Sequence, residues 1–565
     1  MRNHRPSVIP CLALGVLLPA LSPAAPPASH FAAGTHALQM TRIDGGNFVR
    51  DADGAQPATV EISGQGGLLV TGGSFSTKQP AELTQGVELA RGKSIALYNK
   101  SAVGAAQGGA AGRPEHVLYT EAEVRAIFAS GNAQRISEAF TSADAHGVAP
   151  QPLSEAAVLA ALRAAQQLAQ ARELTGWRLA SADGDVHIQG GQFDFHSPNQ
   201  NVMAAPAGTL LWDGGQLQAS GGGGDTVLLG AQGIALTGGR IASLGSQPGG
   251  SWAVQYDPRR RLDRDRWTLG KYLALVTDGD ITIGQPGQPG GSDLQLTDGM
   301  LKISAASARP PQAAAGGAGQ QLRLYGGSIR LEGIHRSTLL AMEAGFGMRA
   351  LIDGGTLSVR SSPSLVGSPL ESPSMWNMST VLKSGVVSLD NAHLVGAGSA
   401  ILGGQLHLSG QSAIYGGAGE LSISGGRIEV SPQSFIGAIR GDSRARSPYP
   451  SSQHNLLLDG GTLHFQVLAP APGQPLQVGT HIGGIHAGDN QPARQSQPRL
   501  RIGPAVRIEL DTAALAPGRY TVTDFASVQE GDGVLDIAAP LPLGSADGRY
   551  HGVLHTDGRL TLVVR

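Results

Sequence analysis

A short pattern of apolar and polar positions recurs along this chain. Apolar residues alternate with polar ones, a Gly-Gly pair follows, and the alternation then resumes. Such alternation has the period of a strand with one buried face, so the pattern predicts many short strands. Clear copies lie at Val186–Phe195, Ile234–Ser243, Leu322–Leu331, Leu421–Val430 and Leu456–Phe465. Weaker copies surround Gly72-Gly73, Gly214-Gly215, Gly354-Gly355 and Gly403-Gly404.

The Gly-Gly pair at the centre of each copy must turn the chain. The apolar residues on either side of it, such as Ile188 and Phe193, are an odd number of positions apart, so one straight strand cannot bury both. Glycine suits a turn because it accepts positive φ and allows close approach of other backbone. A β-hairpin with a two-residue turn and a corner of a β-solenoid both satisfy these conditions. Gly191, Gly215 and Gly239 recur at equal spacing, which favours the solenoid.

One segment of different character, 118–176, interrupts the repeats and is rich in alanine. Glu121, Val124 and Phe128 belong to a helical pattern, and Ser154 is a suitable N-cap for a second helix. We expect a helical hairpin that packs against the solenoid or covers one of its ends, with a partner-binding module as the alternative. The predicted fold is therefore all-β: a right-handed parallel β-helix with a small α-helical insertion. A hairpin-built sandwich or propeller is the alternative for the repeats.

The N-terminus has the features of a secretory signal peptide. Positively charged residues precede an apolar stretch that ends at Leu21, and we expect cleavage near Ala24. A membrane anchor, the alternative, needs about 20 apolar residues, whereas this stretch is interrupted by Pro10 and Pro19. Because the only cysteine, Cys11, lies in the removed segment, the mature chain would enter an oxidising compartment without cysteine.

These observations divide the chain into five expected parts. They are a signal peptide at 1–24, an N-terminal β-solenoid segment at 25–117, the helical insertion at 118–176, β-solenoid repeats at 177–470 and a C-terminal β segment at 471–565. A content of 82 glycines with only 4% aromatic residues fits short strands, tight turns and small interior side chains. Since the formal net charge is −2 and no basic face is evident, we do not expect nucleic acid as a partner.

The repeats, the signal peptide and the C-terminal sequence together resemble the passenger domains of Gram-negative autotransporter adhesins, of the pertactin-like and filamentous haemagglutinin-like type. In that family a G-x-Y motif and a closing D-G-x-L motif lie near the passenger C-terminus, as Gly518–Tyr520 and Asp557–Leu560 do here. The resemblance implies a secreted protein of the cell outer surface that acts in cell adhesion and virulence. The chain lacks the C-terminal translocator barrel of autotransporters, so we expect export through a separate outer-membrane transporter or a split gene.

The most specific local motif is the tripeptide Arg440, Gly441 and Asp442, inside a polar stretch between two copies of the repeat. An exposed turn of this sequence presents a guanidinium and a carboxylate at a fixed separation, and integrins recognise such a pair. We therefore expect a host cell-surface receptor of integrin type, or extracellular matrix, as the partner. An ordinary solvated loop is the alternative.

Signals for an enzyme are weak. No nucleophile elbow or zinc-protease motif is present, and the phosphate-loop-like segment 86–94 has the wrong glycine spacing. Two pairs of acidic residues, Asp183 with Asp185 and Asp278 with Asp280, would be the candidates if the chain were a polysaccharide-degrading β-helix. They also fit D-G-D turns between strands. We expect an adhesin or interaction scaffold without catalytic residues, metal or cofactor; an inert remnant of a split autotransporter is the third hypothesis.

Overall fold

The computed structural model describes most of the chain, with gaps. The described residues are 28–51, 58–78, 119–140, 154–160, 162–163, 175–196, 200–220, 226–244, 271–297, 299–304, 306, 321–333, 340–361, 374–396, 398–416, 421–439, 455–468, 482–485, 499–523, 525–528 and 534–565. The predicted signal peptide and the tripeptide 440–442 lie outside them.

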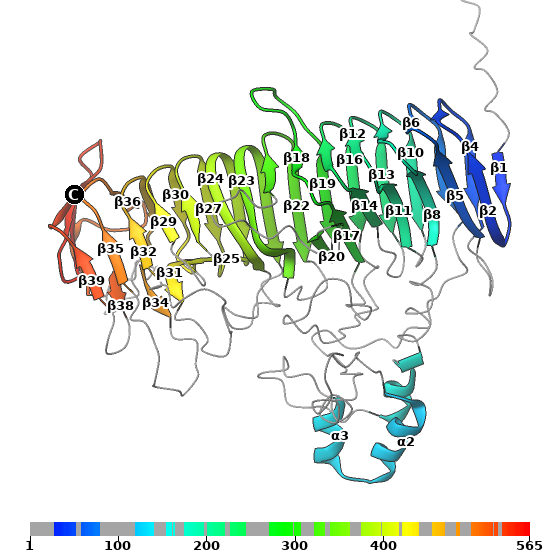
Figure 1. Cartoon of the computed structure of the whole chain (residues 1–565). Helices are drawn as coiled ribbons and strands as arrows, with labels where there is room; N and C mark the ends of the chain where they lie inside the picture. The colour runs from blue at the N-terminus through cyan, green and yellow to red at the C-terminus, as the bar shows by residue number, and fades with distance from the viewer. Residues whose placement is uncertain are drawn as a thin grey trace, which may run out of the picture.

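The chain winds into a right-handed parallel β-helix, as the repeat pattern predicts (Figure 1). Each coil supplies one strand to each of three parallel sheets, named A, B and C here in chain order, and most strands pair with the strand three places later. The hairpin alternative is wrong, because the strands on either side of a Gly-Gly pair belong to different sheets and pair in parallel with other coils. The coil stack also continues past residue 470.

The strands of each sheet are as follows. Sheet A contains β1 (Ala28–Phe31), β4 (Asn47–Arg50), β7 (Ser74–Thr77), β10 (Gln192–His196), β13 (Gln216–Ser220), β16 (Arg240–Leu244), β19 (Asp293–Thr297), β22 (Ser328–Gly333), β27 (Gln405–Ser409), β30 (Arg427–Val430), β33 (Thr462–Gln466) and β36 (Arg507–Asp511). Sheet B contains β2 (Gly34–Gln39), β5 (Ala58–Gly64), β8 (Thr175–Ser181), β11 (Gln200–Ala205), β14 (Thr226–Gly230), β17 (Lys271–Val276), β20 (Gly299–Ser304), β25 (His393–Gly396), β28 (Ala413–Gly416), β31 (Phe435–Ile439), β34 (Ile482–Ile485) and β38 (Ala526–Val528). Sheet C contains β3 (Arg42–Ile43), β6 (Leu68–Val70), β9 (Val186–Ile188), β12 (Thr209–Trp212), β15 (Gly233–Leu236), β18 (Ile281–Ile283), β21 (Gln321–Leu324), β26 (Ser399–Ile401), β29 (Leu421–Ile423), β32 (Asn455–Leu458), β35 (Arg499–Ile502) and β39 (Val534–Ile537). Two long strands, β23 (Leu340–Ser361) and β24 (Ser374–Asp390), run through the corners and pair with all three sheets.

The Gly-Gly pairs form the corner between sheets C and A, where two properties of glycine are needed. The second glycine has positive φ, for example +81° at Gly461, a conformation that other residues rarely adopt. The first glycine lies against the preceding coil, since a Cβ at Gly460 would lie 2.6 Å from the carbonyl oxygen of Ser424. The corner therefore favours glycine at both positions, although Ser384 occupies the first position in β24.

The core is a set of side-chain stacks that run along the helix axis. Phe48, Phe75 and Phe193 occupy equivalent positions in three successive coils, and their rings stack with centroids 5.0 and 4.8 Å apart. One charged side chain, Arg50, is fully buried beside them, where its Nε donates to the carbonyl oxygen of Ala58. Burial lowers the pKa of Arg50 to about 10, and Asp51 partly opposes this shift.

The C-terminal end of the stack is closed by a small antiparallel sheet of β37 (Gly518–Val522), β40 (Leu541–Gly544), β41 (Tyr550–Leu554) and β42 (Leu560–Val564). The phenol oxygen of Tyr550 accepts a hydrogen bond of 2.9 Å from the backbone N–H of Leu510 in the last strand of sheet A. The apolar residues of this cap belong to the same buried cluster as the core of the coils. The N–H of Ala526 in β38 also donates to the carbonyl oxygen of Gly558, so the cap lies over the last strands of sheets A and B.

In the part of the chain that the structure describes, the helices lie in the segment between β7 and β8 (Figure 1). They are α2 (Glu121–Ala129), α3 (Ala133–Phe140) and a helical turn that begins after Ser154. The predicted N-cap is confirmed, because Ser154 Oγ accepts a hydrogen bond of 3.2 Å from the N–H of Ala157. The sequence predicts two helices, whereas the described residues contain three helical segments. α2 ends at Ala129 with Ser130 as its C-cap, and Gly131 with φ +62° turns the chain into α3.

Candidate functional site

The long connections of the chain all adjoin a strand of sheet B. They are the segments 78–174, which contains the helices, 245–270, 305–320, 362–373, 440–454, 467–481 and 486–498. By contrast, the longest connection across the glycine corner, from sheet C to sheet A, is 284–292. Each long segment therefore adjoins one of the two borders of sheet B, either with sheet A or with sheet C. None of them lies at the glycine corner.

The predicted receptor-binding tripeptide Arg440, Gly441 and Asp442 lies outside the described residues. Its segment, 440–454, joins β31 of sheet B to β32 of sheet C. Both strands are fixed in the stack: Ile436 of β31 and Leu456 of β32 are buried, and each strand pairs in parallel on both sides. The segment therefore starts and ends on rigid backbone.

Sheet B has an apolar outer face that the sequence analysis missed. Ala180, Val202 and Ala204 alternate with inward residues, yet they are 2–8% exposed and form a small cluster outside the core. Val227 and Leu229 pack against this cluster. The signal was present as the nearly continuous apolar stretches of β11 and β14, since strands buried on both faces lose the polar–apolar alternation. Sheet B is thus buried on both sides in this part of the stack.

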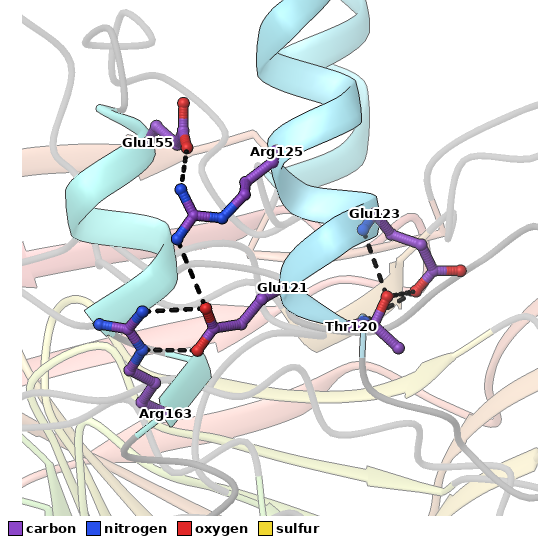
Figure 2. A network of polar contacts seen from close by, with 6 residues as sticks. All are labelled: Thr120, Glu121, Glu123, Arg125, Glu155 and Arg163. Atoms are coloured by element: carbon purple, nitrogen blue, oxygen red, sulfur yellow. Dashed lines mark hydrogen bonds and ion pairs between the residues drawn. The ribbon is translucent and has the colours of Figure 1, made fainter.

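A network of charged residues joins the helical segments (Figure 2). Glu121 at the start of α2 accepts hydrogen bonds of 2.5 and 2.9 Å from Arg163 and lies 3.5 Å from Arg125. Arg125 also pairs with Glu155 at 3.3 Å. The hydrogen bonds from Arg163 lower the pKa of Glu121, with Arg125 adding to the effect. These contacts link residues at opposite ends of the insertion.

α2 begins with a capping box that fixes its orientation (Figure 2). The N–H of Glu123 donates to Thr120 Oγ1 at 3.2 Å, and the N–H of Thr120 donates to the Glu123 carboxylate at 2.7 Å. The two otherwise unpaired donors are therefore satisfied reciprocally. On the inner side of the helical segments, Val124, Phe140, Val158 and Leu162 are buried. The insertion thus has its own apolar contacts and a charged outer side.

A second polar group lies on the outer face of sheet A near the C-terminal end. His407, Glu429, His464 and Glu509 occupy equivalent positions on β27, β30, β33 and β36, so acid and imidazole alternate along the axis. His464 Nδ1 lies 2.6 Å from Glu429. Arg427 contacts Glu429 at 2.6 Å and Glu509 at 2.7 Å. We call these five residues the acid–histidine row.

The electrostatics of the acid–histidine row favour the ionised form of Glu429. Burial by itself raises the pKa of Glu429, but hydrogen bonds from His464 and Arg427 outweigh it, so the pKa lies below the ordinary value. Hydrogen bonds to Glu509 and Glu429 raise the pKa of Arg427. The side chains of Arg427, Glu429, His464 and Glu509 are 22–43% exposed, so the row is a surface feature.

The acidic residues considered for glycan cleavage accept hydrogen bonds from the backbone of neighbouring coils. Asp183 accepts from the N–H of Gly66 at 2.6 Å, and Asp185 from the N–H of Thr209 at 2.7 Å. Asp280 accepts from the N–H of Gln321 at 3.2 Å and pairs with Arg323 at 2.9 Å. Asp278, in the same turn as Asp280, also has a partner. The two pairs lie in turns of coils that are not adjacent, so they are not brought together.

Within the described residues, no three His, Cys, Asp or Glu side chains are grouped so that they could hold a metal ion. In the same part of the chain, no helix combines the length and apolar character required to cross a membrane. Comparison with known proteins found no matching family model, no matching curated protein and no matching solved structure.

Proposed function

We propose that this protein is an exported adhesin or interaction scaffold of the autotransporter-passenger type. It would bind host or cell-surface ligands through the segments inserted at the borders of sheet B. The observation that supports this proposal most directly is that all the long connections adjoin one sheet. Binding residues are commonly placed on loops that a rigid scaffold positions.

The stack of coils is suited to that task. Parallel pairing on both sides holds the strands before and after each inserted segment, so the ends of the segment cannot move independently. The helical insertion has its own charged surface, with Glu121, Arg125 and Glu155 partly exposed. We propose that both kinds of segment make contacts with partners, and that the coils provide the support.

The route to the cell surface is part of the proposal. The signal-peptide features of residues 1–24 support export, and the chain after them contains no cysteine that would form disulfides before an outer membrane is crossed. An outer-membrane transporter would then be the first partner. The second would be an integrin-like receptor or extracellular matrix, bound through Arg440, Gly441 and Asp442.

The test is adhesion of mammalian cells to surfaces coated with residues 25–565. Asp442→Glu keeps the charge but moves the carboxylate by one methylene, so binding through the tripeptide should fall at least about tenfold. Asp536→Glu, at an exposed position of β39, is the matched control and should adhere like the unchanged protein.

The outcomes separate the parts of the proposal. Equal adhesion by Asp442→Glu and the unchanged protein would keep the adhesin and reject the tripeptide. If neither protein supports adhesion to any of several cell types or matrix proteins, the adhesin proposal is wrong, and assays of glycan cleavage become the next step.

A further inference from the structure

The two ends of the coil stack differ. At the C-terminal end the antiparallel cap covers the last coil, and Leu541, Tyr550 and Leu560 are buried against it. At the other end, within the described part of the chain, β1, β2 and β3 pair only with β4, β5 and β6 of the second coil. Half of the backbone N–H and C=O groups of these strands therefore point away from the stack.

At the glycine corner, none of the residues that the structure describes lies against the outer side of the first coil. In later coils a Cβ at the first glycine would strike the coil before it: at Gly72 it would lie 2.6 Å from the carbonyl oxygen of Asp44. At Gly45, the equivalent glycine of the first coil, the same Cβ would have no atom within 4 Å. Inward side chains are correspondingly less covered, since Leu38 of β2 is only partly buried whereas Ile62 of β5 is fully buried.

Within the described residues, β2 carries none of the features that usually protect an open edge. Exposed edges are commonly blocked by proline, by charged side chains or by a covering segment. β2 has the sequence Gly-Thr-His-Ala-Leu-Gln, without proline or a formal charge. It is also the longest strand of the first coil and is paired regularly along its whole length with β5. An unprotected edge of this length is a template for another strand.

We propose that the first coil, β1–β3, is the surface through which two copies of this chain pair end to end. The partner is a second copy, because a contact between two first coils pairs the open backbone groups of both molecules at once. Since the cap lies over the last strands of sheets A and B, it blocks a first coil from stacking on the last coil of another molecule, and a contact between two first coils remains. Such a contact is isologous and closes after two copies.

The sequence of β2 permits this pairing. Two first coils that face each other wind in opposite senses, so β2 of one copy runs antiparallel to β2 of the other. A two-fold axis at Ala37 places this residue opposite its own copy, Thr35 opposite Gln39, and His36 opposite Leu38. Ala37 is exposed and small, so the backbones can approach. No like charges meet, and the partly buried Leu38 becomes covered.

The test uses residues 25–565, whose mass in solution is measured by sedimentation velocity and by light scattering over a range of concentrations. The unchanged protein should have twice the monomer mass. Ala37→Glu and Ala37→Lys should each halve it, because like charges would then face each other across the two-fold axis. Mixing these two variants should restore the dimer. Gln405→Glu adds a charge at an exposed position of an interior coil, and should leave the mass unchanged.

Three results would overturn the proposal. One is a monomer at every concentration for the unchanged protein. Another is a series of larger species, because an isologous contact cannot propagate. The third is a dimer that persists in both Ala37→Glu and Ala37→Lys, since the contact would then lie elsewhere. The circular dichroism of each variant should match that of the unchanged protein, because Ala37 makes no core contact.

Discussion

Glycine at the corner between sheets C and A has two roles. The second glycine of each pair adopts positive φ, and both glycines allow the backbone of the preceding coil to approach, since a Cβ at Gly461 would also lie 2.7 Å from the carbonyl oxygen of Gly425. Asparagine adopts positive φ in some proteins, but its Cβ would still press on the preceding coil. The repeat therefore favours two adjacent glycines where an ordinary turn needs one, although Ser384 takes the place of the first glycine in β24.

The close approach of the preceding coil predicts unequal effects of alanine at the first glycine of different coils. Gly460→Ala should lower the free energy of unfolding by about 1–3 kcal/mol, because its Cβ would press on the carbonyl of Ser424. Gly45→Ala is the matched control: it is the first glycine of the pair in the first coil, and its Cβ meets nothing. Denaturant unfolding followed by circular dichroism measures both. Equal destabilisation by the two variants would contradict the role assigned to the preceding coil.

At the scale of elements, the acid–histidine row links three neighbouring strands of sheet A, β30, β33 and β36, through side chains. Arg427 reaches both Glu429 and Glu509, which are two coils apart, so it passes the intervening His464. Because the carboxylates are partly exposed, each pair contributes little alone. Together the contacts stabilise the pairing of the last coils, and this stabilisation depends on pH.

The lowered pKa of Glu429 gives the sign of the pH dependence. Its stabilising effect is present above the pKa of the unfolded chain, about 4.5, and is lost as the pH falls through the lower pKa of the folded protein. Glu429→Gln should therefore be less stable than the unchanged protein at neutral pH, and the difference should shrink below about pH 4.5. Thermal unfolding across this range measures it. Gln405→Asn on β27 should show a difference that does not depend on pH, and a constant difference for Glu429→Gln would refute the assignment.

The strands and the helical insertion were predictable because their signals are local. Alternation around Ile188 and Phe193 predicts two short strands, and Ser154 predicts a helix start, which the structure confirms. The choice between hairpin and solenoid was not local, since a Gly-Gly pair serves both. The structure decides for the solenoid, because most strands form hydrogen bonds with the strand three places later in the chain. The even spacing of the copies was the only sequence signal for this pairing.

The features of the candidate site were less predictable. The acid–histidine row depends on coils of unequal length bringing His407, Glu429, His464 and Glu509 into register, and inserted segments of different lengths obscure that register in the sequence. The buried outer face of sheet B had a weak signal in apolar strands such as β14. Arg440, Gly441 and Asp442 lie outside the described residues, so their role stays a prediction.

For the whole molecule, the coil is the unit of construction. Deleting 405–426 removes β27, β28, β29 and one Gly-Gly pair, and joins Gly404 directly to Arg427. Because Gly426 normally precedes Arg427, the corner is recreated and each sheet loses one strand. We expect a folded protein that is shorter by about 4.8 Å. Small-angle X-ray scattering measures the length, and thermal unfolding measures the stability.

A deletion of part of a coil is the control for this prediction. Removing 405–416 takes out β27 and β28 but leaves β29, so two successive strands would belong to sheet C. The strands that follow would then face the wrong sheets, and we expect loss of cooperative unfolding. If both deletions unfolded alike, the coil would not be the independent unit that the pairing indicates.

Because the cap covers the C-terminal end, the length of the molecule is set by the number of its coils. With one end fixed by the cap, the reach of the first coil depends only on how many coils lie between them, and it changes in steps of about 4.8 Å while the cross-section stays the same. Gain or loss of a repeat would thus alter how far the protein extends without altering its width, its cap or the open edge at its tip.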